Sequence, residues 1–122
     1  MTNAKLSSLM ARGAEFLGCE TAILCGAMSW VSERNLVSAI SNAGAFGVIA
    51  CGAMTPELLD REIAATKALT DMPFGVNLIT MHPQLFDLID VCARHAVGHI
   101  VLARAGCRPR VVSRRSSRRA RS

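Results

Sequence analysis

The sequence predicts an α/β protein in which buried parallel strands alternate with helices. Hydrophobic residues make up 51% of its 122 residues and aromatic residues only 4%, so aliphatic side chains must supply most of the core of one small domain. Apolar runs of strand length recur about every 25 residues, and amphipathic segments lie between them. A parallel sheet with right-handed helical crossovers requires this order.

The pattern begins with a short amphipathic helix over residues 6–17, which we expect to lie as a lid under the floor of the sheet. Residues 21–25 have the length and apolar character of a buried strand, which Gly26 ends. Ser32 is then predicted to cap a helix over residues 33–43, and Gly44 to end that helix.

The next strand is predicted over residues 46–51. Thr55, Pro56 and Glu57 give a strong helix start, because they place a capping hydroxyl, a proline at the first helical position and an early acid in succession. This helix runs to about Leu69. A strand over residues 74–79 follows, then a helix opened by Pro83, and finally a strand over residues 99–103.

Four strands of this kind fit either a small open sheet or the first half of a (β/α)₈ barrel, and periodicity does not separate the two. A complete barrel takes about 250 residues, so the second alternative implies roughly half a barrel.

The cysteines and the charges are distributed unevenly. The five cysteines are odd in number and include no Cys-x-x-Cys pair, so we expect buried thiols, neither disulfides nor a zinc site, and a cytoplasmic protein. No segment has the roughly 20 apolar residues of a membrane span. Residues 1–103 hold six basic and nine acidic residues, a net charge of −3, whereas residues 104–122 hold eight arginines and no acid.

Candidate ligand contacts follow the first strand and lie within the third. Gly26, Ala27 and Met28 stand at the strand end where parallel α/β folds bind ligands, and small residues there let a flat ligand approach the backbone. A tight turn is the alternative. Asn77 interrupts an apolar strand, where an unpaired amide costs about 1 to 3 kcal/mol. Its partners are either a polar ligand or neighbouring backbone.

Other candidate residues point to structural roles. For His82, before Pro83, a loop or helix-entry position is favoured over catalysis or substrate contact. His95 suits a helix C-terminus, and His99 begins a strand on the floor side. Residues 44–47 follow a helix and lead into a strand, whereas a dinucleotide-binding loop follows a strand and opens a helix, so they do not match one. No cluster has metal-ligand spacing, so no metal is expected.

Several longer motifs together resemble the nitronate monooxygenase family, formerly called 2-nitropropane dioxygenases and related to FMN-dependent enoyl-acyl-carrier-protein reductases. The resemblance covers residues 21–103 and rests on the strings ILCGAMSWVSERNLVSAISNAGAFGVIACGAMTPELL, LTDMPFGVNLIT and HIVLA. The sequence departs from the family pattern at Ala22, where proline is common, and at Ala45, where glycine is common.

The resemblance implies the N-terminal half of an FMN-binding (β/α)₈ TIM barrel over residues 1–103. It implies that the flavin ring rests near Gly26, Ala27 and Met28 and that Asn77 contacts it. The implied activity is oxidation of alkyl nitronates with O₂; the alternatives are reduction of enoyl thioesters with a nicotinamide donor, a barrel acting on a phosphorylated substrate, or a non-enzymatic fragment with an anion-binding tail.

The catalytic histidine and the phosphate-binding glycine loops of the family have no counterpart in this sequence. We therefore expect a truncated chain that is inactive alone, binds FMN weakly or not at all, and self-associates through unpaired sheet edges. A nucleic-acid role for residues 104–122 is not favoured, because no aromatic residue lies among the arginines. We expect residues 104–122 to be disordered or to come from a shifted reading frame, and their Arg/Ser/Ala bias favours the shifted frame. Translating the gene in its other two frames tests that hypothesis.

Overall fold

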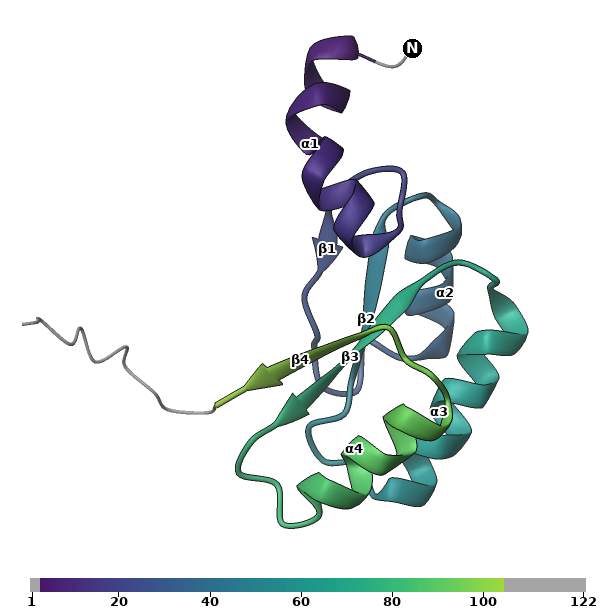
Figure 1. The fold of residues 1–122 in the computed structure, drawn as a ribbon. Helices are drawn as coiled ribbons and strands as arrows, with labels where there is room; N and C mark the ends of the chain where they lie inside the picture. The colour runs from purple at the N-terminus through teal and green to yellow at the C-terminus, as the bar shows by residue number, and fades with distance from the viewer. Residues whose placement is uncertain (1–2, 105–122) are drawn as a thin grey trace, which may run out of the picture.

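Four parallel strands form one sheet whose order follows the chain. In the computed structural model, which describes residues 3–104, the strands are β1 (Leu24–Cys25), β2 (Phe46–Ala50), β3 (Phe74–Ile79) and β4 (His99–Ala103). Each strand pairs in parallel with the next, giving the order β1-β2-β3-β4 (Figure 1). The order never reverses, so this part of the chain lacks the switch point of a doubly wound sheet.

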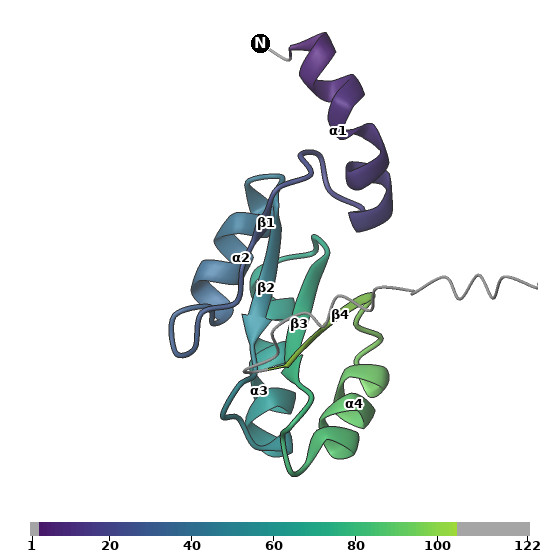
Figure 2. The same ribbon diagram turned by 90° about the vertical axis from the view of Figure 1, so that its left-hand side faces the viewer.

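The helices are α1 (Ala4–Leu17), α2 (Arg34–Asn42), α3 (Pro56–Leu69) and α4 (Leu85–Arg94). The last three cover one face of the sheet, and Figure 2 looks toward the opposite, open face. Helical cover on one side, with strands in chain order, is the arrangement of a (β/α) barrel, whose interior is the open face. The predicted fold class, the N-terminal half of such a barrel, is confirmed.

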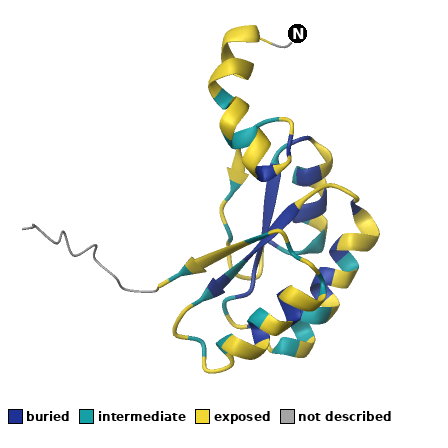
Figure 3. Ribbon diagram, in the orientation of Figure 1, coloured by how far each residue is buried: buried dark blue, intermediate teal, exposed yellow. Residues whose placement is uncertain are grey.

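The main core lies between the sheet and these three helices. Side chains alternate along β3, so Val76 and Leu78 enter this core while Asn77 between them points to the open face. The helices contribute the fully buried residues Val37, Leu59, Ile63, Leu88 and Val91. Burial decreases from the central strands outward, as Figure 3 shows.

Two of the predicted helix starts need correction. Glu33, not Ser32, caps α2, because its carboxylate accepts hydrogen bonds from the backbone N–H groups of Asn35 and Leu36. The last helix begins at Leu85 rather than at Pro83, because a turn precedes it. The start of α3 is as predicted, with Thr55 as the cap.

The first strand is shorter and more exposed than predicted. The backbone N–H of Ile23 bonds to the carbonyl oxygen of Thr21 at 2.7 Å, so residues 21–23 turn instead of extending. Only Leu24 and Cys25 pair with β2, and Leu24 is 49% exposed. The prediction of a buried strand over residues 21–25 was therefore wrong in length and burial.

The first helix covers the floor only with its last turn. Leu17 and Cys19 pack on Phe46 and Val48 of β2 in a small second core. The rest of α1 projects away from the sheet, and Leu9 is 75% exposed (Figures 1 and 3). The expected lid is thus reduced to one turn.

The predictions for the arginine-rich tail over residues 104–122, including its disorder and its shifted reading frame, lie outside the described residues apart from Arg104. Within residues 3–104, no helix is both long and apolar enough to cross a membrane.

Candidate functional site

Asn77 occupies the centre of the open face. In the sheet register it lies between Ala50 of β2 and Val101 of β4, so these three residues form one row across the barrel-interior side. Its side-chain oxygen, Oδ1, is buried and has no hydrogen-bond partner among the described residues. Buried polar atoms in native proteins are nearly always paired, so this unpaired acceptor requires an explanation.

A loop after β1, residues 26–32, lies at the same rim of the sheet. Ser32 is 3% exposed; its hydroxyl accepts a hydrogen bond from the Met28 N–H at 2.9 Å and donates one to the Gly26 carbonyl at 3.4 Å. The Ala50 N–H in turn donates to the Ser32 carbonyl at 3.0 Å. Because Ala50 is the register partner of Asn77, these bonds anchor the loop beside the Asn77 row.

The three candidate residues of this loop differ in what they offer a ligand. A Cβ added at Gly26 would meet nothing within 4 Å, so space is open beside that backbone. Ala27 is half-buried against the second core. Met28 is 47% exposed, but its N–H is already bound by Ser32, which leaves the amides of Gly26 and Ala27 as the donors without acceptors in the described chain.

Ser32 is the residue whose role sequence reasoning missed. A serine before a helix is ordinarily read as its cap, and nothing in the local sequence distinguishes that role from the one observed. Only the loop geometry shows that Ser32 holds the rim segment together.

The histidines are engaged by the protein itself. His82 Nδ1 accepts a hydrogen bond from the Gln84 N–H at 3.0 Å, which supports the favoured helix-entry role. His95 Nε2 lies 2.9 Å from Asp60 Oδ1 of α3, so His95 joins two helices in addition to ending α4. His99 stands on the floor, as expected, with Nε2 2.8 Å from the Phe16 carbonyl oxygen.

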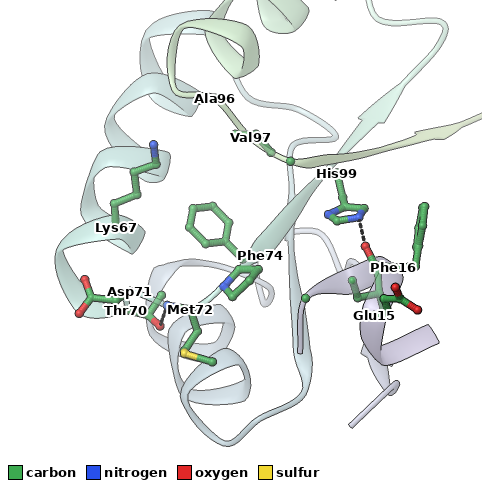
Figure 4. Close-up of a pocket in the computed structure, with 14 residues that line it drawn as sticks. Glu15, Phe16, Lys67, Thr70, Asp71, Met72, Phe74, Ala96, Val97 and His99 are labelled. Atoms are coloured by element: carbon green, nitrogen blue, oxygen red, sulfur yellow. Dashed lines mark hydrogen bonds between the residues drawn. The ribbon is translucent and has the colours of Figure 1, made fainter. Parts of the chain in front are cut away.

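A hollow of about 620 Å³ lies at the floor end, where the strands start (Figure 4). Three of its polar side chains are already bonded within the protein: Thr70 to Asn42, His99 to Phe16, and Lys67 to the His95 carbonyl. The carboxylates of Glu15 and Asp71 also line it, and neither is a buried, unpaired group. In barrels, conserved chemistry lies at the opposite ends of the strands. The Asn77 rim, with its unpaired acceptor, is therefore the better candidate site. Residues 3–104 contain no group of three or more potential metal ligands.

These observations define the protein as half of a parallel (β/α) barrel with a candidate ligand site at the C-terminal ends of its strands. The nitronate monooxygenase family model matches residues 11–107, and the chain belongs to this family. The match extends beyond both ends of the resemblance inferred from the motifs.

The chain is also similar to individual curated proteins. One is the (3aS,4S,5R,7aS)-5-hydroxy-7a-methyl-1-oxo-octahydro-1H-indene-4-carboxyl-CoA dehydrogenase of Mycobacterium tuberculosis, 37% identical over 83 residues, or 68% of this chain and 23% of the relative. The nitronate monooxygenase of Paraburkholderia phytofirmans is 37% identical over 71 residues, or 58% of this chain and 19% of the relative.

Among solved structures, FabK from Thermotoga maritima superposes with a TM-score of 0.73 at 38% identity, over 75% of this chain and 29% of that one. The chain spans about a quarter of the length of the first curated relatives that it matches, 23% and 26%.

Proposed function

We propose that the rim formed by residues 26–32 and Asn77 is the isoalloxazine-binding part of an FMN-dependent oxidoreductase acting on alkyl nitronates. The observation that carries this proposal is the buried, unpartnered Oδ1 of Asn77. Leaving such an oxygen unpaired costs about 1 to 3 kcal/mol, and a ligand N–H would remove that cost. The isoalloxazine ring has an imide N–H of this kind on its polar edge.

The residues of the rim suit a flat ring for a second reason. The space beside Gly26 lets a ring approach the backbone, and the free N–H groups of Gly26 and Ala27 are donors for its carbonyl oxygens and ring nitrogens. Met28 would contribute an exposed apolar side chain rather than its amide. When bound, the flavin supplies the electron transfer from the nitronate to O₂. Ser32 keeps the loop in place.

Oxidoreduction of an acyl thioester is the second candidate. It is favoured by the similarity to the carboxyl-CoA dehydrogenases of Mycobacterium tuberculosis and Rhodococcus jostii, 37% and 35% identical to this chain. Oxygen uptake with an alkyl nitronate, compared with nicotinamide oxidation in the presence of an enoyl thioester, separates the two candidates.

The proposed flavin contact is tested by equilibrium dialysis of the 122-residue chain with FMN. We expect weak binding, with a dissociation constant above about 10 µM, because the chain spans a quarter of its relatives' length and a ring edge alone offers few contacts. Asn77→Ala should weaken binding about tenfold, as expected for loss of one buried hydrogen bond.

The matched control is Asn35→Ala, because Asn35 lies at the exposed start of α2 and bonds only to Glu33 and the α2 turn. If both variants bind FMN as tightly as the unaltered chain, Asn77 does not contact the flavin. Sub-micromolar binding by the chain alone would contradict the expectation that most of the FMN grip lies in other parts of the relatives.

A further inference from the structure

Trp30 has an unusual backbone conformation. Its φ angle is 64°, in the left-handed region that bulky side chains rarely adopt. The Val31 N–H bonds to the Met28 carbonyl at 3.0 Å, so Trp30 is the third residue of a tight turn. A positive φ at this position of a turn ordinarily selects glycine or asparagine.

Ala96 provides a comparison, because it is the other described non-glycine residue with a positive φ, 52°. Ala96 follows the end of α4, where the Val97 N–H bonds to the Cys92 carbonyl and the Ala96 N–H to the Ala93 carbonyl, both at 3.0 Å. This is the usual left-handed helix ending, which accounts for the conformation of Ala96. Trp30 ends no helix.

Packing within the described chain does not offset the strain at Trp30. The residue is 73% exposed, and its indole N–H makes no hydrogen bond to the described residues. Trp30 and Ser29 line a small recess together with Ala50 of β2. Since Ala50 is the register partner of Asn77, this recess adjoins the row that holds the unpaired oxygen.

We propose that Trp30 is a ligand-contacting residue, held in its strained conformation so that the indole packs against the planar ring bound at Asn77. The identity of that ring as FMN rests on the function proposed above. Strained residues concentrate at ligand sites, where the surrounding structure fixes them, and here the Ser32 hydrogen bonds fix the loop. An aromatic side chain exposed at a rim gains its contact area when a flat ligand covers it.

The contact is tested by NMR, because Trp30 is the only tryptophan in the sequence and its indole N–H gives one assignable signal. The ¹⁵N-labelled 122-residue chain is titrated with FMN to millimolar concentrations. We expect the indole signal and the Asn77 side-chain amide signal to shift with the same saturation curve. If Asn77 shifts and the indole does not, the Trp30 contact is overturned while the flavin site stands. If neither shifts, both proposals fail.

Stability measurements test the strain without relying on a ligand. Trp30→Gly should raise the melting temperature by a few degrees, because glycine adopts this φ freely, and should weaken FMN binding about fivefold. Trp30→Phe keeps a ring and should bind FMN within about twofold of the unaltered chain.

Ala96→Gly is the matched control: it relieves the same kind of strain at the floor end and should raise the melting temperature without changing FMN binding. A lower melting temperature for Trp30→Gly would show that the indole packs for stability, and would overturn the proposal.

Discussion

At the residue scale, an ion pair with three hydrogen bonds joins Arg34 at the start of α2 to Glu62 in α3. Glu62 is 4% exposed and accepts hydrogen bonds from the Arg34 N–H at 2.7 Å, Nε at 3.2 Å and Nη2 at 2.7 Å. Burial acts to raise the pKa of Glu62, but the hydrogen bonds and positive charge of Arg34 outweigh it, so the pKa is lowered from its ordinary value. The same contact raises the pKa of Arg34.

Glu62→Gln should therefore reduce the free energy of unfolding by about 2 kcal/mol at pH 7, because the half-exposed Arg34 loses its charged partner but can still be hydrated. Because the pKa of Glu62 is lower in the folded than in the unfolded protein, its carboxylate stabilises the folded state fully at pH values above the unfolded-state pKa of 4.5. This contribution is lost as the pH falls through the folded-state pKa. The difference between the two proteins should disappear in that acidic range.

Urea denaturation at pH 7 and at successive values below pH 4.5 measures this dependence. Glu57→Gln is the control, since Glu57 is exposed in the first turn of the same helix and should cost only a few tenths of a kcal/mol. A pH-independent gap between the unaltered chain and Glu62→Gln would show that the charge of Glu62 is not what stabilises the contact.

The prediction of buried thiols is confirmed for three of the four cysteines in the described residues. Cys19, Cys51 and Cys92 are buried, whereas Cys25 is half-buried, and Cys107 lies outside the described residues. Burial, with a smaller contribution from nearby Cys92, raises the pKa of Cys51 to about 12, so this thiol stays protonated and unreactive at neutral pH.

At the scale of elements, a single glycine sets how closely α2 packs on β2. A Cβ added at Gly47 would lie 2.6 Å from the Val37 carbonyl oxygen and 3.0 Å from its Cα, closer than real contacts allow. Val37 and Gly47 are both buried in this close-packed contact, so an added methyl group finds no free space between α2 and β2.

Gly47→Ala should thus destabilise the fold by about 2 to 3 kcal/mol through overpacking. Gly26→Ala carries the same substitution to a position with open space and should change the free energy of unfolding by less than about 0.5 kcal/mol. Thermal unfolding of the two variants side by side makes the comparison. Equal stability of both would mean that α2 shifts outward freely, contrary to the packing described.

Elements defined by local chemistry were predictable, and elements defined by distant partners were not. The α3 start follows from Thr55 and Pro56, and the β3 limits follow from its apolar run, so the sequence located both. The length of β1 depends on a turn at Thr21 and on pairing with only one neighbour, which no local pattern encodes. For the same reason Asn77 could be singled out by sequence, whereas the role of Ser32 could not.

At the scale of the whole molecule, the sheet is asymmetric in cover and in pairing. Among residues 3–104, three helices cover one face, whereas the other face is covered only near the floor. β1 and β4 each pair on one side within the described chain, and Leu102 of β4 is 58% exposed. We propose that these edges mediate contact with further parallel strands, and that residues 1–103 form the barrel part of the chain.

This uneven pairing has a consequence for how the molecule opens. Backbone amides in β2 and β3 are bonded within a sheet flanked by paired strands on both sides, and Ile49, Val76 and Leu78 are 0% exposed. Amide hydrogen–deuterium exchange should accordingly be slowest at these residues and near the free-amide rate in α1 and β1, with the two groups differing by several kcal/mol of opening free energy. Uniform protection from α1 to β4 would refute this. With the expected pattern, the two parts of the candidate site would differ in local stability. Asn77 belongs to β3, which unfolds last, whereas the loop that carries Trp30 follows β1, which is among the first segments to unfold.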